Sequence, residues 1–224
     1  MDVLLCHLLV ASSDVDEYVT ARRRHNNPAM GDQPGYEGSV LLRPRDDEDP
    51  VPLALLNSWA STADQQRFAT SSRCHDVERR VAHLVRRRDV RRYRRIDDAS
   101  VAVGDAGTAA MCSIGFHQAI AGRGEDYLAA RRDVANPIMS KAPGFVGVSV
   151  CADPDDEDRF MVFLQWANDA AADDCATPEH SGMVFDAIHG VLAHRPASQH
   201  YDVLVWHTPG SGNPASKGGG RRGR

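Results

Sequence analysis

A stretch of 21 residues occurs twice in this chain of 224 residues, and this duplication constrains the fold more than any other feature. Residues 18–38 and 127–147 align without a gap at an offset of 109, and ten of the 21 positions are identical. Further along the chain, Trp59 matches Trp166. A period of about 109 residues is too long for a solenoid repeat. It predicts two copies of one small domain, joined head to tail.

Each copy has the pattern strand, helix, strand, strand, helix, strand. Apolar runs and turn residues predict strands at 3–10, 36–43, 53–59 and 90–96 of the first copy, and at 111–120, 145–151, 160–166 and 200–206 of the second. Helices are predicted at 16–27, 62–88, 125–135 and 169–193. The domains are predicted at 1–97 and 110–207, with a linker at 98–109 and a disordered tail at 208–224.

Such a domain has a reason to occur in pairs. Four antiparallel strands with two helices on one face leave the other face of the sheet uncovered. Two sheets can cover these faces by closing into a barrel between them, so we expect an α+β barrel formed within one chain by tandem duplication. Pro50 and Pro52 begin the third strand, which predicts that this strand lies at a sheet edge.

Composition excludes several classes of protein. The net charge of −5 argues against nucleic-acid binding, and the run Arg86–Arg95 is interpreted as a solvated helix end and edge strand. The five cysteines have no metal-ligand spacing, so no metal site is expected, and their odd number with no leader peptide predicts a cytoplasmic protein. No apolar run approaches 18 residues, so no membrane span is expected.

The order of these elements resembles the antibiotic biosynthesis monooxygenase family. The resemblance rests on the Ala-Arg-rich helix, the Pro-Gly-aromatic turn, the acidic hairpin, the strand that ends in Trp166 and the turn Thr177–His180. It implies a dimeric α+β barrel of ferredoxin-like halves. Fused two-copy members are similar in layout to ring-opening oxygenases of angucycline-type polyketide pathways, which use dioxygen and reduced flavin.

The resemblance also implies the partners of the reaction. The substrate would be a polycyclic aromatic polyketide, and dioxygen the oxidant. No cofactor would be tightly bound, and reduced flavin (FMNH2 or FADH2) from a separate flavin reductase would be the co-substrate of a ring-opening member. Two such pseudo-dimeric chains could form a homodimer. Haem degradation is disfavoured, because Phe68 and Cys175 stand where haem-degrading members carry a tryptophan.

The candidate site residues lie mainly in the second copy, which is richer in aromatic residues and methionine. An apolar slot for a flat polycycle needs such a lining, and a histidine can accept a phenolic proton near neutral pH. The catalytic candidates are His180, Trp166 and His117. The substrate-binding candidates are Phe116, Phe163, Met183, Phe185 and His189, together with Asn57 and Trp59 on one strand face of the first copy. A polyketide cyclase that needs no oxygen, or a non-catalytic binding protein, would use the same slot.

Overall fold

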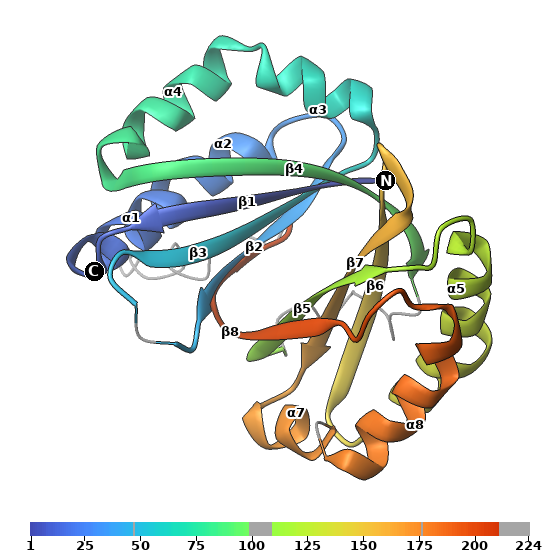
Figure 1. The fold of residues 1–224 in the computed structure, drawn as a ribbon. Coiled ribbons are helices and arrows are strands. Elements are labelled where there is room, and N and C mark those ends of the chain that lie inside the picture. The colour runs from blue at the N-terminus through green and yellow to red at the C-terminus, as the bar shows by residue number, and fades with distance from the viewer. Residues whose placement is uncertain (47, 99–108, 176, 211–224) are drawn as a thin grey trace, which may run out of the picture.

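The two copies form two matching halves of the molecule (Figure 1). A computed structural model describes residues 1–46, 48–98, 109–175 and 177–210, without the side chains of 97, 98 and 178–180. The first half contains β1 (Asp2–Val10), α1 (Val15–Ala21), α2 (Asn27–Gly31), β2 (Tyr36–Pro44), β3 (Val51–Trp59), α3 (Thr62–Ala69), α4 (Ser72–Val81) and β4 (Val85–Asp98). The second contains β5 (Met111–Gln118), α5 (Gly124–Ala130), α6 (Asn136–Met139), β6 (Phe145–Asp153), β7 (Asp156–Trp166), α7 (Asp169–Cys175), α8 (Pro178–Ile188) and β8 (Ala197–His207).

The eight strands close into one antiparallel barrel. The strand order is β1-β3-β2-β8-β5-β7-β6-β4, and β4 pairs with β1 to complete the ring. Each half contributes a four-stranded sheet, and the two sheets join at the pairs β2–β8 and β4–β6. The helices lie on the outside of the barrel, on the far face of each sheet (Figure 1). This architecture confirms the predicted α+β barrel built from two ferredoxin-like halves.

Both halves contribute side chains to the barrel interior. Leu5 and Leu42 of the first half lie in one buried cluster with Ile114 and Met161 of the second. Tyr93 and Tyr201 occupy matching positions on β4 and β8 and belong to the same cluster. Each sheet therefore covers the apolar face that the other would expose, as expected from the sequence.

The first helix of each half departs from its predicted course. The chain stays helical past Asn27 and Pro28, because a π-turn at Arg22–Asn26 links α1 to α2. Pro28 lies in the first turn of α2, where a missing N–H removes little hydrogen bonding. The second half repeats this π-turn at Arg131–Ala135. The predicted stop before the proline was therefore wrong.

The second helix of each half is also broken. Ser71 begins α4 as its N-cap, since its Oγ accepts a hydrogen bond from the Cys74 N–H at 3.1 Å. The chain leaves the helix before the arginine run, so β4 starts at Val85 rather than at residue 90. In the second half, the predicted helix at 169–193 is divided into α7 and α8.

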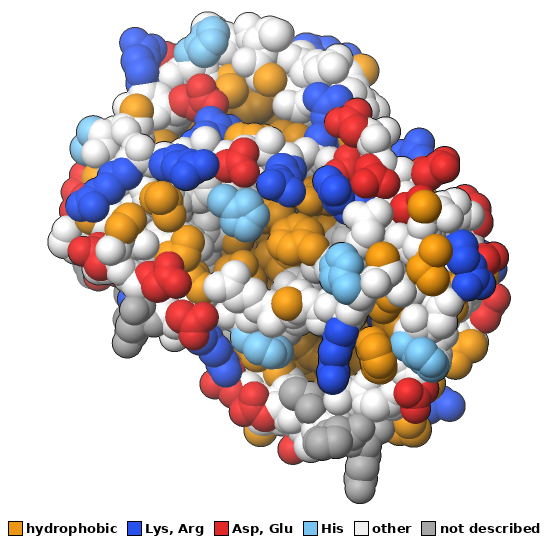
Figure 2. Space-filling model, viewed as in Figure 1, with side chains coloured by type: hydrophobic (Ala, Val, Ile, Leu, Met, Phe, Trp, Pro, Cys, Tyr) orange, Lys and Arg blue, Asp and Glu red, His pale blue; other side chains and the backbone are white. Residues whose placement is uncertain are grey.

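The strand pairing bears on two further expectations, one for the arginine run and one for β3. β4 pairs with β1 along most of the run, but its pairing with β6 begins only at Arg94, so residues 86–93 have a strand on one side only, as the edge-strand interpretation predicted, and most of the arginines are exposed. A row of basic and acidic side chains crosses the molecule where β4 runs (Figure 2). β3 pairs with β1 along its whole length and with β2 from Ala54 to Trp59, so the expectation that this strand lies at a sheet edge was wrong. Pro52 lies opposite Leu9 of β1 but beyond the last β2–β3 pair, so the sheet does not need its missing N–H on the β2 side.

Two predicted segments lie largely outside the residues that the structure describes. These are the linker at 98–109 and the tail at 208–224. Among the helices of the described residues, none combines the length and apolar character needed to cross a membrane.

We expect Gly144→Ala to destabilise the protein more than Gly122→Ala does. Both glycines have left-handed φ angles, 72° and 76°, so both substitutions cost about 1 kcal/mol of backbone strain. An alanine Cβ at 144 would also lie 2.4 Å from the Cβ of Ala171, whereas nothing lies within 4 Å of one at 122. Urea unfolding of the two variants measures the difference. Equal losses would show that the turn at Gly144 does not depend on its contact with α7.

Candidate functional site

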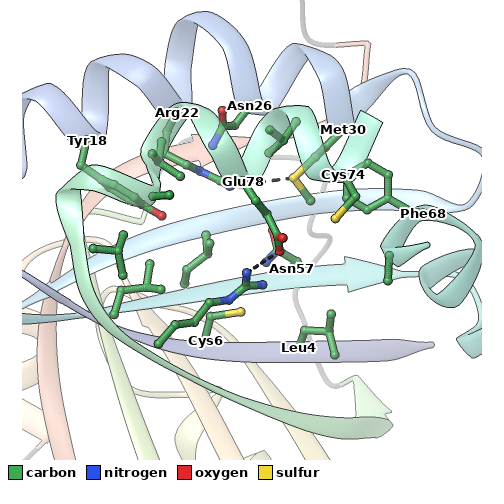
Figure 3. Close-up of a pocket in the computed structure, with 18 of the residues that line it drawn as sticks. Leu4, Cys6, Tyr18, Arg22, Asn26, Met30, Asn57, Phe68, Cys74 and Glu78 are labelled. Atoms are coloured by element: carbon green, nitrogen blue, oxygen red, sulfur yellow. Dashed lines mark hydrogen bonds and ion pairs between the residues drawn. The ribbon is translucent and has the colours of Figure 1, made fainter. Parts of the chain in front are cut away.

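Each half contains a cavity, partly open to solvent, between the outer face of its sheet and its helices. The first cavity has a volume of about 420 Å³ and lies between β1, β3 and the helices α1 to α4 (Figure 3). The second has a volume of about 310 Å³ and lies between the strands β5 and β7 and the helices α6, α7 and α8. Both volumes fall in the lower part of the range typical of small-molecule sites.

The duplication places the same three residue types in both cavities. Arg22, Met30 and Trp59 line the first cavity. Their equivalents Arg131, Met139 and Trp166 line the second. The π-turn explains the position of the arginine, because Arg22 and Arg131 are each the first residue of that turn and both are buried. π-turns within helices occur often at functional sites.

The arginine of the second cavity has no matching negative charge among the residues described. Arg131 is 3% exposed, and its Nε and Nη2 have no hydrogen-bond partner among those residues. The described side chains that line this cavity include a second arginine, Arg195, but no carboxylate. Trp166 Nε1 is a further buried donor without a partner in the described structure. Because buried charges are normally paired, these donors favour an anionic ligand.

A buried histidine lies in the same cavity. His117 comes from β5, is 6% exposed and lies 5.6 Å from the ring of Tyr127 between centroids. Burial lowers its pKa from 6.5 to about 3, with further lowering by the charges of Arg131 and His194. The imidazole is therefore neutral at pH 7 and can accept a hydrogen bond. Strand register places Leu8, not a histidine, at the equivalent position of the first half.

Polar and aromatic groups complete the second cavity. The Ser113 Oγ and the His200 Nδ1 are 2.9 Å apart, which links β5 to β8 at the cavity wall. Burial lowers the pKa of His200, and the charge of Arg45 adds to this effect. On α8, the Phe185 ring carries the Arg195 guanidinium above it at 5.1 Å. This cation–π contact brings a second positive charge to the wall.

The first cavity has a different polar lining. Asn26, Asn57 and Gln65 supply three amide groups, and Glu78 lies at the edge of the cavity, where it pairs with Arg88 of β4 (dashed line in Figure 3). Deeper in the cavity, Arg22 donates to the Met30 Sδ at 3.8 Å and to the Ser39 Oγ at 3.3 Å.

The structure brings together only part of the predicted site. Trp166, His117 and Phe185 line the second cavity, and Asn57 and Trp59 share the first cavity as their common strand face implied. Phe163 belongs to the barrel interior, on the opposite face of β7 from the second cavity. Phe116, Met183 and His189 are exposed and are not part of either lining. The side chain of His180 is outside the described part of the structure.

Several lining residues were missed from the sequence. Arg22 and Arg131 occupy the same position in the two copies, so their identity across the duplication could have indicated them as site residues. His200 and Ser113 gave no such signal, because their contact depends on the pairing of β5 with β8. The described residues contain no group of three or more His, Cys, Asp or Glu side chains placed to hold a metal ion.

We expect the free energy of unfolding of His117→Leu to fall less steeply than that of the wild type as the pH is lowered below 6.5. In the unfolded chain His117 binds a proton near pH 6.5, whereas in the folded protein it binds one only near pH 3. The contribution of His117 to the free energy of unfolding is therefore fully present above pH 6.5. It is lost as the pH falls toward 3, by up to about 1.4 kcal/mol per pH unit. Urea unfolding between pH 6.5 and 4.5 measures the slope. The exposed His25→Leu is the control, and equal slopes in the two variants would contradict the burial argument.

Comparisons with known proteins agree with this architecture. Residues 111–182 match the sequence model of the family described as antibiotic biosynthesis monooxygenase. No curated protein matches the chain. Among solved structures, a proposed monooxygenase from Lactobacillus acidophilus NCFM is 15% identical with a TM-score of 0.70, covering 93% of this chain and 96% of its own.

Two further solved structures share the layout over most of the chain. A proposed monooxygenase from Fusobacterium nucleatum is 8% identical with a TM-score of 0.73, covering 92% of this chain and 94% of its own. An anthrone oxidase-like protein is 14% identical with a TM-score of 0.62, covering 93% of both chains. At these identities the likeness is one of fold. Residues 111–182 of the second half thus match the antibiotic biosynthesis monooxygenase model, and the whole chain shares the two-copy fold of these solved structures.

Proposed function

We propose that the protein is an oxygenase that binds a flat polycyclic phenol in the second cavity, as the phenolate, and oxidises it with dioxygen. The observation that supports this proposal is the buried Arg131, whose guanidinium lacks a carboxylate partner among the described residues. A phenolate would supply the missing negative charge. The second cavity is chosen over the first because it adds His117, whereas the first has Leu8 at that position and the carboxylate of Glu78 in its lining.

The walls of the second cavity suit a flat aromatic body. Trp166 and Phe185 supply aromatic surface, and Val162, Leu164 and Ile188 supply aliphatic surface. A cavity of about 310 Å³ suits a single small polycyclic molecule. Apolar walls with a few donors at fixed places orient such a ligand and exclude water from it.

The reaction needs an electron-rich substrate. Arg131 and the Trp166 Nε1 stabilise the phenolate oxygen, and His117 accepts the phenolic proton. Burial is the main cause of the low pKa of His117, and the negative charge of a phenolate beside the imidazole would raise that pKa. The deprotonated ring then delivers electrons from carbon to dioxygen, and a carbon–oxygen bond forms to give a peroxide. Loss of one water molecule from a protonated peroxide at a CH carbon leaves a ketone, the carbonyl of a quinone. Carbon is oxidised, and dioxygen supplies both the carbonyl oxygen and the oxygen of the water.

Reduced flavin does not fit the second cavity together with such a substrate. The volume of about 310 Å³ leaves no room for an isoalloxazine ring beside a polycycle. No step above therefore involves flavin. Ring opening with reduced flavin from a separate reductase is therefore the alternative that this volume disfavours, and it forms a separate arm of the experiment below.

The proposed substrate class is the aromatic polyketides, with angucycline-type molecules as the narrower candidate. The support is the two-copy layout and a cavity that combines apolar walls with donors for a phenolate. One solved structure of the same layout is described as anthrone oxidase-like, and anthrones are flat polycyclic molecules of this kind. Anthrones and benz[a]anthraquinone phenols are therefore the substrates to test.

We expect oxygen-dependent conversion of 1,8-dihydroxyanthrone or of a benz[a]anthraquinone phenol. The substrates are incubated in ¹⁸O-labelled dioxygen and under nitrogen, with and without flavin, NADH and a flavin reductase, and are analysed by mass spectrometry against enzyme-free controls. Label incorporation without flavin supports oxidation by the substrate carbanion, and incorporation only with reduced flavin supports a ring-opening reaction. Loss of water without label indicates a cyclase, and no conversion in any arm indicates a binding protein. Either of these last results rejects the oxygenase.

We expect Arg131→Met to lower kcat/KM at least tenfold. A hydrogen bond to a charged group is worth about 1.5–3 kcal/mol, and the variant removes the positive charge that stabilises the phenolate. Arg132→Met is the control on the same turn, because Arg132 is exposed and pairs with Asp133 at 2.8 Å. Arg22→Met should have a smaller effect than Arg131→Met. Equal losses for these two variants would contradict the assignment of the reaction to the second half.

A further inference from the structure

The first cavity carries a set of amide side chains that the second half does not repeat. Asn26, Asn57 and Gln65 line it, and at the equivalent positions the second half has Ala135, Leu164 and Ala172. We propose that the first cavity is a ligand site of its own, which differs in chemistry from the reaction site in the second cavity. It binds a neutral polyhydroxylated aromatic molecule. This proposal does not rest on the oxygenase activity, because it concerns binding in the other half of the chain.

The burial of these amides is the first argument. Asn26 is 1% exposed, Asn57 5% and Gln65 9%. The carbonyl oxygen of each amide is buried and accepts no hydrogen bond from the described residues. A buried polar group without a partner typically costs about 1–3 kcal/mol, so three in the wall of one cavity are hard to explain as packing. Hydrogen-bond donors on a ligand would satisfy them.

The same cavity also offers donors. The Nε of Arg22 and the Nε1 of Trp59 are buried and have no acceptor within the described structure. A ligand that satisfies this wall must therefore both donate to the amides and accept from the arginine and the tryptophan. A hydroxyl group does both, since it has one donor and two acceptor positions. Several hydroxyl groups along the edge of one molecule would match the wall.

The described lining of the first cavity contains one carboxylate, Glu78, and four arginines. The arginines at 86–88 are exposed, so Arg22 is the buried positive charge. Three amide oxygens place partial negative charge in the wall, and the carboxylate of Glu78 adds a full one at the edge. Glu78 already neutralises Arg88 through their ion pair. In the second cavity the residue equivalent to Glu78 is Phe185, so the two sites differ in charge as well as in amides. The amide oxygens and Glu78 offset the charge of Arg22, so the first cavity needs less negative charge from a ligand than the second, whose described lining has no carboxylate.

The apolar surfaces of the first cavity suit an aromatic body. The rings of Trp59 and Phe68 are stacked, with centroids 5.3 Å apart and planes inclined by 29°. Tyr18, Met30 and Phe68 come from three different helical segments, and Leu4 and Asn57 come from the sheet that faces them (Figure 3). A flat ligand between the helices and this sheet would place its edge beside Asn57. At about 420 Å³, this cavity is larger than the reaction site.

The test counts binding sites with a neutral dihydroxylated probe. The probe is 1,8-dihydroxyanthraquinone, titrated into the full chain at pH 6 by isothermal calorimetry. The double variant Asn57→Leu/Gln65→Ala carries the residues of the second half at two of the amide positions. We expect the wild type to bind probe at the first cavity, and the double variant to lose that site or to bind it at least tenfold more weakly. Arg131→Met, which alters only the second cavity, should retain it.

A second ligand tests the same idea without any variant. 1,8-Dimethoxyanthraquinone keeps the shape of the rings but has no hydroxyl donors, so it should bind the wild-type first cavity at least tenfold more weakly than the dihydroxy probe. Circular dichroism and thermal unfolding show whether the double variant is folded, and the single variant Gln65→Ala replaces it where it is not. Unchanged stoichiometry and affinity in the amide variants, equal binding of the two probes at this site, or no binding at all would overturn the proposal. Failure of the oxygen experiment would leave it standing.

Discussion

The pairing of the two sheets into one barrel is the constraint on which the rest of the structure depends. Each sheet has an apolar inner face, and the buried cluster inside the barrel draws on both halves, as Leu5 and Ile114 show. Since the inner faces cover each other, the helices must lie on the outer faces, and the two cavities form where helices and sheet do not fill the space. The position of both sites therefore follows from how the barrel closes.

The duplication and the succession of strands and helices along the chain were readable from the sequence, whereas the face on which each strand residue lies was predicted only in part. Trp166 and Phe163 are three residues apart on β7, so strand alternation puts them on opposite faces, and only Trp166 reaches the second cavity. Aromatic character alone had suggested both. The π-turn at Arg22 could not be anticipated, because Pro28 favours a helix end before it and the helix continues only through a change in hydrogen-bond spacing.

Candidate site residues could be predicted where the chemistry of a single residue marks it, and could not be predicted where a contact depends on the pairing of two strands. His117 and Trp166 stood out by chemistry, and both line the second cavity. The contact of Ser113 with His200 joins residues 87 positions apart, and only the register between β5 and β8 creates it. The two cavities share an arginine, a methionine and a tryptophan, while histidine and amides distinguish them. The shared residues come from the duplication, and the different ones give the two cavities different chemistry.

The place of β8 in the barrel sets the order in which the chain can fold. This last strand, Ala197–His207, pairs with β2, whose residues precede it by more than 150 positions, and also with β5. During synthesis, β2 and β5 therefore leave the ribosome long before their common partner, and each carries a row of unpaired backbone groups until it arrives. Such long-range pairing slows folding and exposes strand edges to neighbouring chains. A nascent chain of this design needs protection from aggregation until its final segment is complete.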